Sequence, residues 1–175
     1  MYLRAADKSD IHAIANLHAA SWRHVYRGAL SDEYLAGDIM ADRVATWTQR
    51  LSSPAAGQFV TVAEGNGQLV GFACAFAGSD PEWGTLLDNL HVSLPNQRRG
   101  IGAALLHQVA RWCMTEDPNQ GLYLWVNQSN VTAQHFYASL GTKNVGSDVW
   151  NPPDGGIVPT FRYAWRCIRD LLPEG

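Results

Sequence analysis

The sequence contains little charge and no surplus of positive charge. Lys and Arg together number 13, Asp and Glu number 16, and the formal net charge is -3 at pH 7. A surface with this balance lacks the cationic excess needed to neutralise the phosphates of a nucleic acid or the headgroups of an anionic membrane. We therefore expect that neither nucleic acid nor a membrane is a partner.

Long apolar runs are also missing. The first five residues, MYLRA, do not form the apolar run of a signal peptide. Elsewhere, no stretch approaches the roughly 20 apolar residues that cross a bilayer. The sequence therefore predicts a soluble, cytoplasmic protein.

Patterns typical of metal sites and disulfide frameworks are absent as well. The three cysteines, Cys74, Cys113 and Cys167, are odd in number and widely spaced. The six histidines show no HExxH or equivalent spacing. We expect buried, reduced thiols and no metal ion.

Apolar residues are plentiful, and their spacing predicts the fold. Hydrophobic residues make up 46% of the 175 residues, which is enough for one substantial core, and no repeat or linker divides residues 1–175 into two domains. The pattern predicts strands at 2–6, 58–64, 69–77, 85–92, 121–127, 143–150 and 158–165, two helices between 10 and 51, and helices at 100–114 and 130–140. The turn Asn66-Gly67 makes one strand pair antiparallel, and the strand-helix-strand crossover from Leu86 to Val126 makes another pair parallel. We therefore predict a three-layer α/β/α sandwich around a mixed sheet.

A phosphate-binding loop is predicted where a strand is followed by Gln97-Arg98-Arg99-Gly100-Ile101-Gly102 and then a helix. The first turn of a helix has N–H groups without internal partners, and the helix dipole adds partial positive charge there. Gly100 and Gly102 would let a pyrophosphate approach those amides, and Arg98 and Arg99 add charge. A glycine pair after a strand can also serve packing alone. The neighbouring residues are therefore needed to distinguish a ligand site from a packing feature.

Two other phosphate-binding loops fit the neighbouring residues poorly. A nucleoside triphosphate loop needs Lys and Ser or Thr after the glycine, but Gly102 is followed by Ala103 and Ala104. A dinucleotide-binding loop needs a third glycine where Leu105 stands. Neither class is favoured.

With these residues the chain resembles the GCN5-related N-acetyltransferases, whose fourth strand and third helix are joined by the pattern [Gln/Arg]-x-x-Gly-x-[Gly/Ala]. Gln97, Gly100 and Gly102 match that pattern. Further similar features are Leu90-His91-Val92 as the end of the fourth strand, Asn130 with Phe136-Tyr137 and Gly141, and the segment from Trp22 to Gly28. The resemblance covers nearly the whole chain.

The resemblance implies acetyl transfer from acetyl-coenzyme A to a primary amine of a small molecule, peptide or protein, by direct attack in a ternary complex. It also implies a splay between strands 4 and 5. The main chain of Leu90 and Val92 would pair with the pantetheine arm there. The amides from Arg98 to Ala103, those of Ile101 and Gly102 included, would hold the pyrophosphate, Asn130 would bond near the pantetheine, and Tyr137 would protonate the departing sulfur. Related enzymes often form dimers, so a homodimer is one expected assembly.

The general base is the least determined part of this prediction. Several members of the family have a glutamate early in strand 4, where this sequence has Leu86. Asp88 and His91 are equal candidates, Glu82 is a third, and proton removal through ordered water stays open. A surface carboxylate and a satisfied imidazole are the alternative interpretations of Asp88 and His91.

Two interpretations also stay open for the residues that would bind the acceptor and for the function of the protein. Trp22 and Tyr26 lie four residues apart, so they would share a helix face and either line the acceptor pocket or pack in the core. The residues that select the acceptor are expected at about 22–47 and 150–159. The missing glutamate favours a second function, a non-catalytic acyl-CoA-binding regulatory module, whereas Tyr137 favours catalysis.

Overall fold

The sheet of the computed structural model is mixed and mostly antiparallel. The structure describes residues 1–28, 30–37, 39–152 and 154–172; Ala29, Asp38 and Pro153, which fall in the segments expected to select the acceptor, lie outside this part. Within it, seven strands are hydrogen-bonded in the order β1-β2-β3-β4-β5-β7-β6. The strands are β1 (Tyr2–Ala5), β2 (Gln58–Gly65), β3 (Gln68–Asp80), β4 (Gly84–Val92), β5 (Leu122–Asn127), β6 (Lys143–Trp150) and β7 (Val158–Trp165). Only β4 and β5 pair in parallel among these strands, as the crossover predicted.

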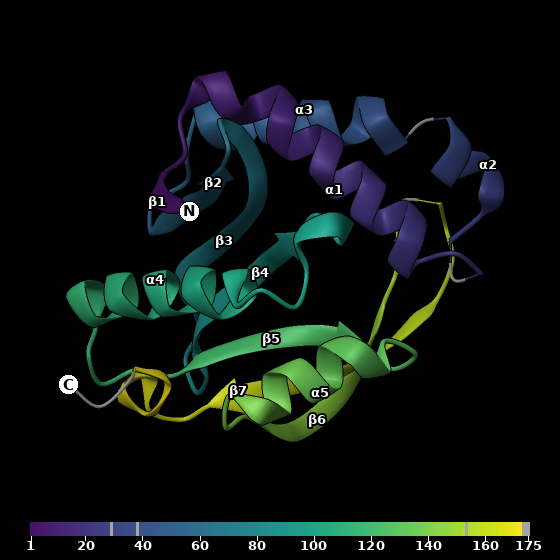
Figure 1. Cartoon of the computed structure of the whole chain (residues 1–175). Coiled ribbons are helices and arrows are strands. Elements are labelled where there is room, and N and C mark those ends of the chain that lie inside the picture. Colours follow the sequence, from purple (N-terminus) through teal and green to yellow (C-terminus); the bar gives the residue numbers. More distant parts are fainter. Residues whose placement is uncertain (29, 38, 153, 173–175) are drawn as a thin grey trace.

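Helices cover both faces of the sheet, as predicted for a three-layer sandwich (Figure 1). One layer contains α1 (Ile11–Val25), α2 (Asp32–Ala36) and α3 (Ile39–Ser52), and the other contains α4 (Ile101–Glu116) and α5 (Val131–Ser139). Short 3-10 helices lie at Lys8–Asp10, Leu94–Asn96 and Ile168–Leu171. The prediction of two helices between 10 and 51 was wrong, because the second one is divided: α2 ends at its C-cap Gly37, a residue with low helix propensity.

Two apolar cores hold the layers to the sheet. The larger packs α4 and α5 against β2 to β5 and β7, with Leu105, Leu106 and Leu122 fully buried. The smaller packs α1 and α3 against β2 and β3 around Trp47 and Phe72. The alternation predicted for β5 is confirmed, since the side chains of its first, third and fifth residues lie in the larger core and those of its second and fourth on the opposite face.

The predicted turn and cap residues are also confirmed. Asn66 and Gly67 have φ values of 53° and 73°, the left-handed pair that a type I′ hairpin requires. The Asn130 side chain accepts a hydrogen bond from the Ala133 N–H at 3.1 Å and so caps α5, and Gly141 follows that helix with a φ of 86°.

The sheet opens between β4 and β5. The two strands pair only at Thr85 with Leu122 and at Leu86 with Tyr123, and beyond that point they separate. The expected splay is therefore present. It positions the site, because a strand edge that has lost its neighbour presents main-chain N–H and C=O groups to the space beside it.

No helix in the described part of the chain has both the length and the apolar character needed to span a bilayer.

Candidate active site

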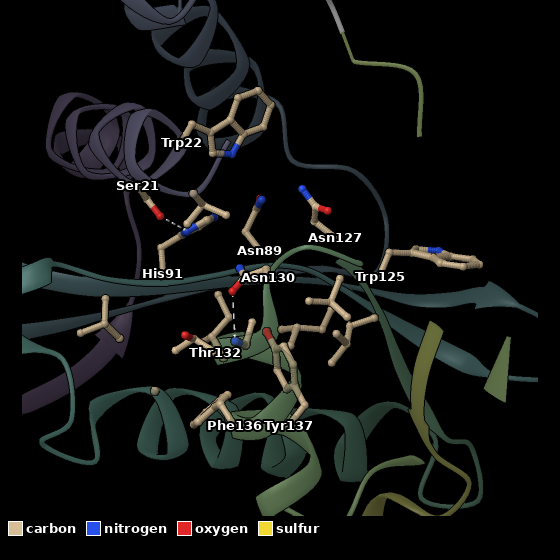
Figure 2. Close-up of a pocket in the computed structure, with 18 of the residues that line it drawn as sticks. Ser21, Trp22, Asn89, His91, Trp125, Asn127, Asn130, Thr132, Phe136 and Tyr137 are labelled. Carbon is tan, nitrogen blue, oxygen red and sulfur yellow. Dashed lines mark hydrogen bonds between the residues drawn. The ribbon is translucent and has the colours of Figure 1, made fainter. Parts of the chain in front are cut away.

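A cavity of about 1590 Å³ occupies the splay. Its walls come from α1, the second half of β4, the start of α4, the end of β5, α5 and the end of β6 (Figure 2). Small-ligand pockets commonly measure about 300 to 1000 Å³. The space is therefore large enough for two ligands side by side.

The open edge of β4 points its main chain into this cavity. The Ser93 N–H donates to the Val70 carbonyl at 2.9 Å, which makes those two residues a hydrogen-bonded pair of the β3–β4 ladder. Because paired and unpaired positions alternate in an antiparallel ladder, Leu90 and Val92 direct their N–H and C=O groups away from β3 and into the splay. Both residues line the cavity.

The N-terminus of α4 forms the second wall. Its first helical hydrogen bond runs from the Ala104 N–H to the Gly100 carbonyl at 3.0 Å, and no side chain caps the helix. The N–H groups of Ile101, Gly102 and Ala103 thus have no helical partner, and the first turn contains no acidic residue. This end of the helix is suited to an anion.

The loop before α4 has an unusual backbone and a side-chain clamp. Arg98 and Gly100 have φ values of 63° and 79°, so two left-handed residues lie close together in the turn. The Gln97 amide group donates to the Val92 carbonyl at 3.2 Å and ties the loop to β4, a contact that the sequence did not indicate. Arg98 lines the cavity, whereas Arg99 is exposed and does not line it.

The two glycines of the motif are needed for different reasons. A Cβ on Gly100 would meet nothing within 4 Å, so glycine is required there by its left-handed backbone. A Cβ on Gly102 would lie 3.2 Å from Cζ of Phe136, so its missing side chain makes room for the α5 ring. The packing role weighed for the glycine pair therefore applies to Gly102.

Tyr137 lies on α5 beneath the splay. Its side chain is buried, and Figure 2 shows its hydroxyl directed toward the gap between β4 and β5. Burial, and next the neighbouring Tyr26, raise the pKa of Tyr137 well above its usual value near 10. The hydroxyl therefore stays protonated and available as a proton donor.

His91 lies on the opposite side of the sheet from Tyr137. Its Nδ1 is 2.7 Å from the Ser21 Oγ of α1, and its ring packs 4.7 Å from the ring of His18 (Figure 2). Burial, and then the charge of Arg43, lower the pKa of His91 to about 4. The imidazole is neutral at physiological pH and retains a lone pair that can accept a proton.

Asp88 is the extra residue of a bulge in β4. The β3 partners change from Cys74 with Asn89 to Ala75 with Leu87, so Asp88 is left without an opposite residue. Its carboxylate pairs with Arg50 Nη1 of α3 at 2.8 Å and lines the cavity. Glu82 is exposed, lies 3.8 Å from Arg166 and does not line the cavity.

Aromatic residues close the end of the cavity at α1 and β6. The rings of Trp22, Tyr26 and Trp150 lie 5.3 to 5.5 Å apart, edge to face or tilted. All three line the cavity, and Trp22 also belongs to a packed cluster with α2 and α3. The two interpretations of Trp22 and Tyr26 are therefore compatible: the residues pack together and also form a wall.

Sequence reasoning missed the polar side chains on this wall. The cavity is also lined by Asn89 of β4 and Asn127 at the end of β5, and by Arg43 and Arg50 of α3. The alternation of β5 was the one available signal, because it places Asn127 on the same face as Trp125. The arginines come from a helix far away in the sequence.

Within the described residues, no group of three or more His, Cys, Asp or Glu side chains is arranged to hold a metal ion. The cysteines Cys74, Cys113 and Cys167 are not in disulfides, and the first two are buried.

Comparison with known proteins gives a consistent result. The model of the acetyltransferase (GNAT) family matches residues 11–142. A probable N-acetyltransferase of Mycobacterium tuberculosis is 29% identical, with 98% of this chain and 95% of that protein covered. An uncharacterized N-acetyltransferase of Archaeoglobus fulgidus is 30% identical, with 89% and 97% covered.

Solved structures share the fold at low sequence identity. A GCN5-related N-acetyltransferase from Rhodopseudomonas palustris has a TM-score of 0.74 at 22% identity, with 94% of each chain covered. The PaiA N-acetyltransferase from Thermoplasma acidophilum, crystallised with coenzyme A, has a TM-score of 0.69 at 17% identity, covering 94% of this chain and 98% of that one. A putative acetyltransferase from Salmonella typhimurium, solved with acetyl-CoA, has a TM-score of 0.67 at 18% identity, covering 100% and 96%.

Proposed function

The chain belongs to the acetyltransferase (GNAT) family, and we propose that it moves the acetyl group of acetyl-CoA onto a primary amine by direct attack in a ternary complex. The activity of an acetyl-CoA-dependent N-acetyltransferase follows from that membership and from neighbours of the same fold that hold coenzyme A or acetyl-CoA. The observation that carries the proposal is the open edge of β4, which faces the hydroxyl of Tyr137 across one cavity.

Acetyl-CoA would be held mainly by the main chain. The N–H and C=O groups of Leu90 and the C=O group of Val92 are directed to pair with the amides of a pantetheine arm as an added strand would. The uncapped N–H groups at the start of α4 suit the pyrophosphate, with the Arg98 side chain adding charge. The Asn130 oxygen is occupied by the α5 cap, so its amide nitrogen is the group left to donate to the arm.

Two groups would stabilise the reaction of the thioester. The Val92 N–H, directed into the splay, would donate to the carbonyl oxygen as negative charge develops there, and such preorganised donors are worth about 3 to 4 kcal/mol. Tyr137 would give its proton to the departing sulfur. The raised pKa of this tyrosine keeps the proton in place until the thiolate forms and takes it.

For the general base we propose His91 rather than Asp88. The Asp88 carboxylate is already paired with Arg50, whereas His91 is neutral and is held by Ser21. With a pKa of about 4, His91 is a weak base. It would therefore accept the proton only after the amine has bonded to the thioester carbon and has become acidic, and would pass it on to water.

The proposal also covers the subcellular location of the protein and the chemical class of its acceptor. The cysteines are not in disulfides, which supports a location in the reducing environment of the cytoplasm. The acceptor is a small-molecule amine or an amino group of a peptide or protein, and the wall formed by Trp22, Tyr26 and Trp150 favours one with an apolar body.

The proposal is tested by mixing the purified protein with acetyl-CoA and a broad amine panel and measuring thiol release. Release that depends on both the amine and the protein is the expected result. Calorimetric binding of acetyl-CoA without turnover of any amine would instead support the non-catalytic acyl-CoA-binding module, which the Leu86 position favours.

A further inference from the structure

The wall of the cavity formed by α1, α3 and the ends of β4 and β5 has more hydrogen-bond donors than its own acceptors can satisfy. Asn127 is buried, with 6% of its surface exposed. Its Oδ1 accepts from the Ser129 N–H at 2.9 Å and from the Ser129 Oγ at 3.0 Å, which fixes which end of the amide is nitrogen. Its Nδ2 has no hydrogen-bond partner in the described part of the chain.

Asn89, which is half-buried, lies across the splay. Its Oδ1 accepts from Arg50 Nη1 at 2.8 Å, so its amide nitrogen is the group left over. Figure 2 shows Asn89 and Asn127 pointing to the same side of the sheet, toward Trp22 and away from the ring of Tyr137. Each splayed strand thus contributes one N–H₂ group to the acceptor side.

Arg43 adds a buried cation to this wall. Only 8% of its surface is exposed, its guanidinium lies 4.2 Å from the ring centroid of Trp22, and its Nη2 bonds to Asp42 at 2.7 Å. Its Nε has no partner among the residues described. A buried donor without a partner is destabilising, and a bound oxygen would satisfy it.

Carboxylates on the same wall offer little to a second ammonium group. Asp88 is paired with Arg50. Asp42 of α3 does not line the cavity and is paired with Arg43. Asp148, which also lines the cavity, lies at the exposed edge of the sheet on β6. A diamine or polyamine would therefore find aromatic rings but few unpaired negative groups.

We propose that the acceptor is an α-aminoacyl compound, in which the reacting amine is attached to a carbon that also bears a carbonyl or carboxylate group and an apolar side chain. This inference rests on the proposed function. The amides of Asn89 and Asn127 bind the carbonyl oxygen, and the rings of Trp22, Tyr26 and Trp150 contact the apolar side chain. The shared chemistry occurs in a free amino acid and at the amino terminus of a peptide.

The step transfers the acetyl group from sulfur to the α-nitrogen. The carbon–sulfur bond of the thioester breaks as a carbon–nitrogen bond forms, the nitrogen loses one proton to the base, and the sulfur gains one from the acid. The products are an N-acetylated α-amine and free coenzyme A, and no oxidant or metal is involved.

A matched pair of amines tests the class. L-phenylalaninamide and 2-phenylethylamine share a ring and an amine and differ by the carboxamide alone. An alkylamine holds its proton about 2 to 3 pH units more tightly than an α-amino group, so kcat/KM of each must be divided by its neutral fraction. After that correction, we expect L-phenylalaninamide to be favoured about tenfold or more, since each hydrogen bond contributes up to about tenfold.

Three variants assign that preference to the two amides. Asn127→Asp and Asn89→Asp keep the accepting oxygens but replace the N–H₂ donors by oxygen, and each should reduce the preference by up to about tenfold. Asn144→Asp is the matched control, because Asn144 Oδ1 also accepts from a backbone N–H two residues ahead but lies exposed on β6. Calorimetry with coenzyme A shows whether each variant is folded. If Asn127→Asp does not fold, Asn89→Asp provides the test, because Asn89 is less buried than Asn127.

The outcomes separate this inference from the proposed function. Turnover of L-phenylalanine alone, or of a peptide with an amino-terminal phenylalanine alone, identifies the source and supports the class. Equal corrected rates for the matched amines, or a faster corrected rate for spermidine, would overturn the class while leaving an acetyltransferase. A preference unchanged in both Asn variants would overturn the assignment of the carbonyl contact to the two amides. No amine-dependent thiol release with any amine would overturn both.

Discussion

Replacing Tyr137 by Phe removes one oxygen from the proposed acid and leaves the ring in place. The hydroxyl is directed into the cavity, and no other group in the described part of the chain bonds to it (Figure 2). The substitution therefore leaves no former partner unsatisfied, and we expect the free energy of unfolding to change by less than about 1 kcal/mol.

The effect on rate should be far larger than the effect on stability. A positioned general acid supplies about 100-fold or more, so kcat should fall at least about 100-fold in Tyr137→Phe. Acetyl-CoA should bind with nearly the same affinity, because the arm and the pyrophosphate are held by main-chain groups of β4 and α4. Since the pKa of Tyr137 lies well above its usual value, the wild-type rate should show no loss attributable to its ionisation up to pH 10.

The assay is thiol release under saturating acetyl-CoA and acceptor, with single-turnover measurements to show that chemistry limits the rate. Tyr163→Phe is the matched control, because Tyr163 is a buried tyrosine of the same core that does not line the cavity. The reasoning fails if chemistry limits turnover and kcat of Tyr137→Phe stays within about threefold of the wild type.

Four further predictions concern the motif glycines and the base. Gly100→Ala should lower the free energy of unfolding, measured in a urea titration, by about 1 to 2 kcal/mol, because an alanine must adopt the left-handed backbone. Gly102→Leu should also weaken acetyl-CoA binding, measured by calorimetry, because the larger side chain pushes α4 away from α5. His91→Gln should lower kcat/KM about 100-fold and Asp88→Asn only a few fold; the reverse order would identify Asp88 as the base. Since the folded pKa of His91, about 4, lies below the unfolded value near 6.5, the wild type should lose up to about 3 kcal/mol as pH falls from 6.5 to 4, and His91→Gln should show a shallower loss in the same titration.

The sequence was sufficient for those features that depend on neighbouring residues. Hydrophobic spacing located every strand to within a few residues, and the turn at Asn66-Gly67 and the caps at Asn130 and Gly141 follow from the chemistry of single side chains. The division between α2 and α3 was missed, because a lone glycine in a helical pattern does not say whether the helix continues past it.

Contacts between distant segments could not be predicted in this way. The pairing of Asp88 with Arg50 and the clamp of Gln97 on Val92 depend on where β4 meets α3 and the α4 loop in space. The facing amides of Asn89 and Asn127 depend on the splay, which is a property of two strands losing contact and is not visible in either strand alone.

The bulge at Asp88 decides which side chains of β4 reach the acceptor. In a regular strand, side chains alternate between faces, so a strand that buries Leu87 against α4 would point its odd-numbered positions there and turn Leu90 toward α1. The extra residue shifts this alternation by one: Leu90 joins the α4 core, whereas His91 meets Ser21 and Asn89 meets Arg50 on the opposite face. The same shift leaves the main chain of Leu90 and Val92 directed into the splay. One inserted residue thus places the proposed base, an amide donor and the edge for the pantetheine arm on a single cavity.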